Sequence, residues 1–322
     1  YTIAWVCALY IETAAALAML DEKHGELPRC LNDDNTYTLV SMKNHNIVIA
    51  SLPQDQYGNI NSASVLTNLK RTFLSIRYGL MVGIGGGAPA NKDIRLGDIV
   101  VGTRVMQYDL GKILSGGGIQ RTAIPKSPDR SLCTAVTNLR ASHEIYPIQV
   151  PAIIQERMQR LIDYHRPSAP DHLFLASYQH DPSMANCQGC DQSQLEGRKI
   201  RRSGEPKIHY GGIASSNQVM KDTATRDCLA KELDIICFEM EAAAYAREFL
   251  EALPATGDVS RDSWPNVRFR MLAIYPASAQ VKEAAEQANT GNRRQLLMES
   301  LEFDQIDSRR TTIKNAYSKT CS

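Results

Sequence analysis

Acidic residues stand directly after two strongly apolar segments of the chain. Glu12 follows the apolar residues 2–8. Glu239 and Glu241 flank Met240 at the end of a second apolar run. In α/β proteins the carboxyl ends of sheet strands open into ligand crevices, where a carboxylate can accept hydrogen bonds from both hydroxyls of a ribose. Taken alone, Glu12 is more simply interpreted as a solvated glutamate in a first helical turn.

A glycine-rich run, Gly83-Ile84-Gly85-Gly86-Gly87, follows a third apolar segment. Glycines let backbone N–H groups approach a ligand closely, so such a run can cradle an anion. The run matches neither the spacing of a dinucleotide-binding loop nor the Gly-Lys-Ser/Thr ending of an NTPase loop. A tight turn at the end of a strand is therefore an equally good interpretation.

Cys187-x-x-Cys190 supplies half of a zinc site, with His172, His180 and Asp191 as nearby ligand candidates. The sequence has no second Cys-x-x-Cys, so an ordinary pair of reduced cysteines is the favoured interpretation and no metal is expected. Neither a Gly-x-Ser-x-Gly elbow nor a His-Glu-x-x-His motif is present, which leaves serine-hydrolase and zinc-protease chemistry without support.

The charge balance gives no reason to expect nucleic acid or a membrane as the main partner. The 322 residues include 36 Lys and Arg against 35 Asp and Glu, a formal net charge of +1. Lys199, Arg201 and Arg202 form a small basic cluster, interpreted as a solvated face. Several of the eight cysteines stand in apolar runs, and no stretch approaches the ~20 residues of a spanning helix. We expect a soluble cytoplasmic protein, cut from a longer chain because it begins at Tyr1.

Strand-like and helix-like patterns alternate along the chain, which predicts an α/β protein. Strands are expected at residues 2–8, 37–42, 46–52, 78–84, 97–105, 208–215 and 235–240, and helices at 13–20, 60–73, 132–141, 152–164 and 222–233. Residues 165–206 are polar and lack periodicity, so they are expected to form an insertion loop. The sheet is expected to be mixed or parallel at its centre.

Four segments, in this order, resemble the nucleoside phosphorylase family: residues 5–12, 81–87, 95–101 and 238–243. The likeness covers about residues 1–250 and is greatest to fungal members that form the N-terminal domain of larger NACHT, NB-ARC, ankyrin or TPR proteins. It implies a three-layer α/β/α sandwich with a central mixed sheet, a purine nucleoside or nucleotide as ligand, and no cofactor. It also implies a homodimer and a further C-terminal NACHT, ankyrin or TPR module.

Within that family the chain looks closer to the methylthioadenosine/S-adenosylhomocysteine nucleosidases than to the phosphorylases. Phosphorylases place a Gly and an Arg in the first loop to hold phosphate, whereas this loop offers Tyr10 and Glu12. The resemblance implies that Glu12 is the base that deprotonates the attacking water. It implies further substrate contacts as follows: Gly85, Gly86 and Gly87 against the ribose and the nucleophile, Met240 and Glu241 on the ribose, and Ser215, Val219 and Met220 at the purine.

The sequence departs from the family pattern after Ala243. In the family a further strand follows and carries an Asp that protonates purine N7, but here residues 244–250 already resemble the last helix. One strand near the C-terminal side is therefore expected to be missing. Residues 267–275 have the composition of a strand, but Pro276 and the two residues after it stand where the Asp would be needed.

Three functions stay open at this stage: hydrolysis, nucleoside binding without turnover, and phosphorolysis, of which the last is disfavoured because the first loop has no Arg. We expect a nucleoside phosphorylase-like domain over residues 1–253 and a loop with a helical linker over residues 254–322.

Overall fold

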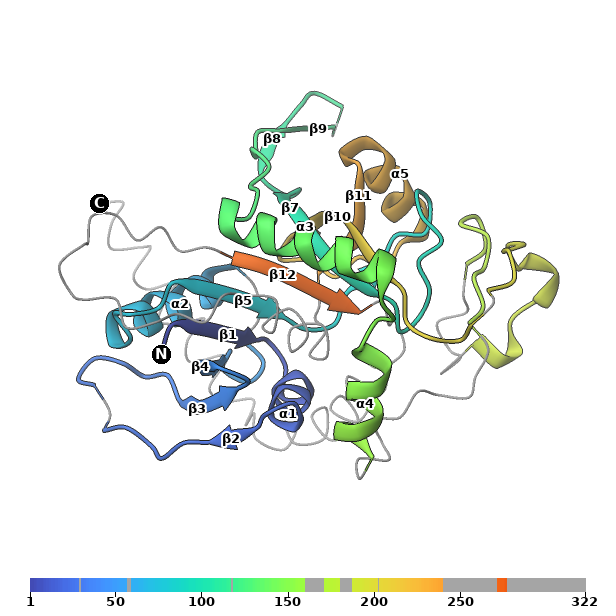
Figure 1. Ribbon diagram of the computed structural model, residues 1–322. Coiled ribbons are helices and arrows are strands. Elements are labelled where there is room, and N and C mark those ends of the chain that lie inside the picture. The colour runs from blue at the N-terminus through green and yellow to red at the C-terminus, as the bar shows by residue number, and fades with distance from the viewer. Residues whose placement is uncertain are drawn as a thin grey trace, which may run out of the picture. The chain divides into compact units, whose positions relative to one another are not determined.

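The computed structural model describes residues 1–28, 30–56, 59–116, 118–159, 171–179, 187–201, 203–239 and 271–276. The strands in these residues are β1 (Ile3–Cys7), β2 (Glu22–Lys23), β3 (Tyr37–Met42), β4 (His45–Ser51), β5 (Tyr78–Val82), β6 (Gly86–Gly87), β7 (Ile99–Gln107), β8 (Gly111–Ile113), β9 (Ile119–Arg121), β10 (Ile208–Ser215), β11 (Ile235–Phe238) and β12 (Met271–Pro276). The helices are α1 (Tyr10–Ala18), α2 (Asn59–Thr72), α3 (Arg130–Ile145), α4 (Val150–Met158) and α5 (Thr223–Leu233). All strands but β8 and β9 join one mixed sheet, shown in Figure 1, in the order β2-β3-β4-β1-β5-β12-β7-β10-β11-β6.

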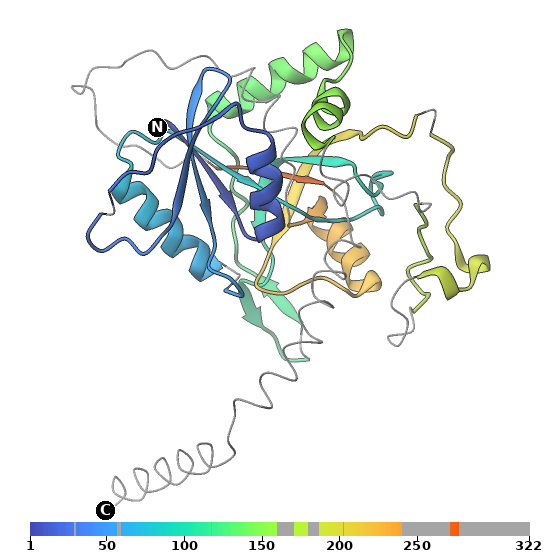
Figure 2. The same ribbon diagram turned by 90° about the horizontal axis from the view of Figure 1, so that it is seen from below.

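Helices cover both faces of this sheet, because successive side chains of a strand point to opposite faces. In β1, Ile3, Trp5 and Cys7 pack in a cluster with residues of α1, α3 and α4. Ala4, between them, packs with Val65 and other residues of α2 on the other face. Figures 1 and 2 show the same arrangement, with the sheet between two layers of helices. The three-layer α/β/α sandwich is confirmed.

The expected elements of the first half form close to their expected bounds. β3 and β4 pair as an antiparallel hairpin, and Lys43 in the turn between them has a positive φ of 53°. Further on, the Asp129 carboxylate accepts the N–H of Ser131 at the start of α3, and the Asp222 carboxylate accepts the N–H of Thr225 at the start of α5. Such caps satisfy N–H groups that a helix start leaves unpaired, and they fix where each helix begins.

The sheet curves so that the ends of distant strands meet. β4, β1, β5 and β12 run in one direction, while β7, β10 and β11 run in the other. β6 follows β5 after only residues 83–85, yet it pairs with β11 at the far end of the strand order. At the bend in β10, a Cβ on Gly212 would lie 2.9 Å from the backbone carbonyl oxygen of Asp234, so the close approach of the chain just before β11 favours glycine there.

A strand from the C-terminal part of the chain does complete the middle of the sheet, although the sequence leads us to expect that one such strand is missing. β12 pairs in parallel with β5, Met271 opposite Gly79, and antiparallel with β7, Ile274 opposite Val101. Residues after 254 therefore contribute to the same sheet, and the compact unit runs from Tyr1 to Ser278. Apart from β12, the loop and helical linker expected over residues 254–322 lie outside the described residues.

Candidate active site

Glu12 is a buried carboxylate at the carboxyl end of β1. The chain passes from the strand into α1 through Ala8 and Leu9, and Leu9 is still extended. Oε2 of Glu12 accepts the backbone N–H of Ala8 at 2.9 Å and that of Leu9 at 2.5 Å, and the residue is only 5% exposed. The carboxylate thus accepts backbone N–H groups at the start of α1, as the glutamate of a capping box does. These hydrogen bonds hold it in one orientation. The interpretation as a solvated glutamate is wrong.

The glycine run lies between the end of β1 and the end of β11. Val6 of β1 pairs with Met81 of β5, so the start of the run follows the strand next to Glu12. The run then enters β6, where Gly86 pairs with Phe238. Gly85, Gly86 and Gly87 thus form a short edge that connects the two acidic segments of the chain.

Ser215 and Glu239 meet at the ends of β10 and β11. Ser215 is buried, and its hydroxyl hydrogen bonds to the carboxyl of Glu239. The Glu239 N–H also donates to the Ala214 carbonyl at 3.3 Å. Burial raises the pKa of the half-buried Glu239, and the Ser215 hydrogen bond offsets only part of that rise. A carboxyl in such a place favours its protonated form more than a solvated glutamate does.

Tyr108 supports the turn that leads away from Ser215. Its hydroxyl accepts a hydrogen bond from Ser216 Oγ at 2.7 Å, and its backbone N–H donates to the Ser215 carbonyl at 3.1 Å. The buried ring packs edge-on against Phe238, with ring centroids 5.6 Å apart. One aromatic side chain therefore ties the end of β11 to the turn after β10. Sequence reasoning missed Tyr108 as a residue of the candidate site.

The remaining expected substrate contacts differ in their surroundings. Met220 is half-buried and packs against the cluster that includes Tyr108 and Phe238, whereas Val219 is 56% exposed. Met240 and Glu241 lie outside the described residues. Of the acidic pair around Met240, Glu239 is the member that the structure describes.

The Arg95–Val101 segment takes part in an ion-pair cluster centred on Asp98. Asp98, 1% exposed, accepts Arg201 Nη1 at 2.6 Å, Arg201 Nη2 at 2.5 Å and the backbone N–H groups of Arg95 and Lys207, and it lies 2.8 Å from His209 Nε2. Burial alone would raise the pKa of Asp98, but these hydrogen bonds outweigh burial and hold the pKa well below its usual range. The prediction that this basic cluster faces solvent is thus wrong for Arg201, whose side chain is 10% exposed.

Residues 2–247 match the family model of the phosphorylase superfamily. The chain belongs to the phosphorylase superfamily. A nucleotide-binding leucine-rich repeat (NLR)-like protein from Hyaloscypha variabilis is 39% identical over 259 residues, which are 77% of this chain and 25% of that protein. The chain thus spans a quarter of the length of this fungal relative.

Two further proteins align with this chain over most of its length and over most of their own length. A 5'-methylthioadenosine/S-adenosylhomocysteine nucleosidase from Mycobacterium bovis is 27% identical over 251 residues, 76% of this chain and 78% of its own. A solved structure from Borrelia burgdorferi, which carries the same nucleosidase name and is bound to adenine, superposes with a TM-score of 0.51. It is 12% identical and covers 88% of this chain and 92% of its own, so it supports the fold alone.

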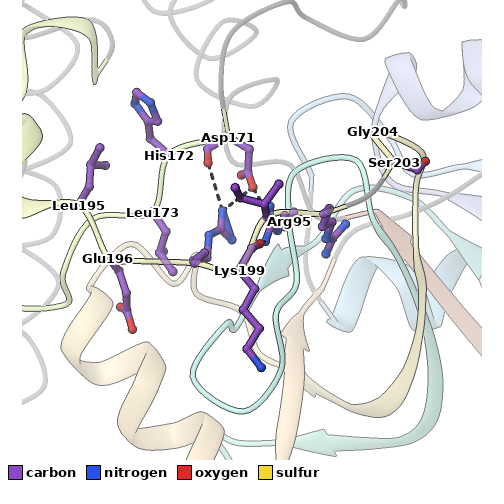
Figure 3. Close-up of a pocket in the computed structure, with 12 residues that line it drawn as sticks. Arg95, Asp171, His172, Leu173, Leu195, Glu196, Lys199, Ser203 and Gly204 are labelled. Atoms are coloured by element: carbon purple, nitrogen blue, oxygen red, sulfur yellow. Dashed lines mark hydrogen bonds and ion pairs between the residues drawn. The ribbon is translucent and has the colours of Figure 1, made fainter.

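A hollow of about 450 Å³ in this chain is lined by residues of the insertion and by Arg95. Neither Glu12 nor Glu239 is among its lining residues. Arg95, Asp171 and Arg198 line it, and Figure 3 shows Asp171 turned toward a neighbouring guanidinium while Lys199 points away. The Arg198 guanidinium is paired with Asp171, and that of Arg95 with Asp93. Because these charges are already satisfied, the hollow is not the candidate active site.

The cysteine pair of the insertion stands at a 3₁₀ turn, Cys187–Gly189. Cys190 is buried. Within the described part of the chain, no group of three or more His, Cys, Asp or Glu side chains is placed to hold a metal ion. Nor does any helix in that part have the length and apolar character needed to cross a membrane.

Proposed function

We propose that this chain is a purine nucleosidase domain that hydrolyses the N-glycosidic bond of an adenine nucleoside or nucleotide. The observation that carries the proposal is the buried Glu12 carboxylate, held by two backbone N–H groups where β1 ends beside the glycine run. A carboxylate in a fixed orientation at the carboxyl end of a central strand is well placed to take a proton from water. The name of the mycobacterial relative supports adenine nucleosides as the substrate class.

In the proposed reaction, water attacks C1′ of the ribose while the C1′–N bond to the base breaks. The transition state has the character of a ribosyl oxocarbenium ion, which carboxylates and fixed dipoles stabilise. Glu12 takes the proton of the attacking water. Gly85–Gly87 lie against the ribose, Met240 and Glu241 hold it, and the Ser215, Val219 and Met220 segment lines the purine.

A nucleoside-binding module without turnover is the second candidate. It is favoured by the sequence after Glu241, which runs directly into residues 244–250 without the Asp-bearing strand that the resemblance implies. Losing a general acid costs about 10²- to 10⁴-fold in rate. A module of this kind would keep the pocket and lose the chemistry.

Incubation of the purified chain with adenosine, methylthioadenosine, inosine or ATP, with and without phosphate, separates these functions. The proposal predicts free base in phosphate-free buffer. Base release that requires phosphate would replace hydrolysis by phosphorolysis, and tight binding with no free base would establish the binding module. No binding and no release would contradict both candidates.

We also infer that the domain works inside a larger cytoplasmic protein. The fungal NLR-like relative, of which the chain spans a quarter, supports a modular context in which cleavage or binding of a nucleoside serves the further modules. A homodimer is part of this proposal, and sedimentation equilibrium of the purified chain tests it.

A further inference from the structure

Hydrolysis of an adenine nucleoside needs a proton for the departing base as well as a base for the water. Adenine that leaves as an anion is a poor leaving group, and protonation of a ring nitrogen removes that barrier. Glu12 accepts a proton in the same step, so it cannot supply this one. A second group with a protonated side chain is required, and it has to lie on the purine side of the site.

The glycine run connects the strand next to β1, which precedes Glu12, with the strand that pairs with β11, which precedes Glu239. Glu239 directly follows Phe238, which pairs with Gly86, and Gly86 is connected to β5 through three residues only. Two strand spacings of about 5 Å and this short turn keep the two backbones within roughly 20 Å of each other. The long side chains of two glutamates and a nucleoside between them fit such a span.

Two contacts of Glu239 and one of the preceding residue hold Glu239 beside Ser215, where the segment expected to line the purine begins. The Glu239 carboxyl hydrogen bonds to the Ser215 hydroxyl, the Glu239 N–H donates to Ala214, and the preceding Phe238 is held by the ring of Tyr108. The residue is half-buried, and burial raises the pKa of its carboxyl. Such surroundings favour the protonated form of the Glu239 carboxyl more than solvent does.

We propose that Glu239 is the general acid that protonates the departing purine, an assignment that rests on the proposed nucleosidase function. The O–H bond of the Glu239 carboxylic acid breaks and its proton goes to a ring nitrogen of the base. The electron pair of the C1′–N bond goes to the base, water oxygen forms the new bond to C1′, and Glu12 takes the water proton. Glu12 then loses its proton to solvent and Glu239 regains one, so the cycle consumes only water and nucleoside.

The test compares Glu239→Gln with wild type on ribosides whose leaving groups need a proton to different degrees. Adenosine needs it most, 6-chloropurine riboside less, and p-nitrophenyl riboside does not need it. We expect Glu239→Gln to lose about 10²- to 10⁴-fold in kcat on adenosine and less than about tenfold on the nitrophenyl riboside. The plot of rate against leaving-group acidity is then steeper for the variant than for wild type.

Two other variants separate this role from a structural one. Glu12→Gln is expected to lose activity equally on all leaving groups, and Glu232→Gln, at an exposed glutamate of α5, is expected to match wild type. Equal losses across the series in Glu239→Gln, or undiminished adenosine cleavage, would overturn the assignment. If wild type releases no base from any riboside, the proposed function itself fails, and that result differs from a failure confined to Glu239→Gln.

Discussion

The surroundings of Glu12 and Glu239 suit different roles in catalysis. Glu12 accepts two backbone N–H groups at the start of a helix, whereas Glu239 is half-buried against a serine hydroxyl. The sequence alone predicted an acidic residue after β1 and after β11, because an apolar run followed by a carboxylate can be recognised in the amino-acid sequence. It could not tell that Glu239 contacts Ser215, since that contact joins the ends of two different strands.

Replacement of Glu12 by Gln is expected to abolish base release. The amide keeps the size of the side chain but cannot take a proton from water, and loss of a general base costs about 10²- to 10⁴-fold in kcat. Release of adenine, followed by its absorbance, measures the effect, and circular dichroism confirms that the variant is folded. Unchanged turnover would remove Glu12 from the mechanism.

Replacement of Tyr108 by Phe is expected to weaken substrate binding while kcat changes little. The variant keeps the ring against Phe238 but loses the hydrogen bond from Ser216 Oγ, so the turn at residues 216–218 is held less firmly. We expect a stability loss of about 1 kcal/mol and a several-fold higher KM. Steady-state kinetics and thermal melts check both. An equal fall in kcat with unchanged KM would contradict this role.

At the scale of elements, the strands and helices with clear periodicity could be predicted from sequence, because each buries one face or both. β6 and the β8–β9 hairpin could not, since two or three residues carry no period. The ion pair of Arg201 with Asp98 was also hidden: 103 positions separate the two residues, and a basic residue in a polar loop usually faces water.

Replacement of Asp98 by Asn is expected to destabilise the chain by about 3 kcal/mol, because it removes the buried carboxylate that pairs with Arg201 and leaves that guanidinium with Asp93, 3.5 Å away, as its carboxylate partner. Urea unfolding measures this, with Glu232→Gln, which breaks an exposed ion pair with Arg121, as the control expected to lose less than about 1 kcal/mol. A loss no larger than that of the control would show that the cluster does not hold the insertion to the sheet.

The same carboxylate makes stability depend on pH in the acid range. The pKa of Asp98 is lowered in the folded state, so its contribution is fully present above the unfolded value of about 3.9 and is lost as pH falls below it toward the folded value. The stability difference between wild type and Asp98→Asn is therefore expected to shrink between about pH 4 and pH 2. Thermal melts across that range check it, and a difference that grows on acidification would contradict the sign.

At the scale of the whole molecule, a strand from beyond the expected domain boundary completes the sheet. β12 lies between β5 and β7, so a chain that ends at residue 253 would leave two central strand edges open. We expect residues 1–253 to aggregate and residues 1–278 to stay monodisperse with a cooperative melt. Light scattering and calorimetry measure this, and a well-folded 1–253 fragment would show that β12 is dispensable.

The proposed hydrolysis at the carboxyl ends of β1, β5 and β11 is tested most directly by the fate of the water oxygen. In phosphate-free buffer made with ¹⁸O-labelled water, the chain is expected to convert an adenine nucleoside to free adenine and a sugar that carries one ¹⁸O atom at C1, as mass spectrometry would detect. Glu12→Gln is expected to yield neither product. A sugar without label, or cleavage that persists in Glu12→Gln, would contradict the account.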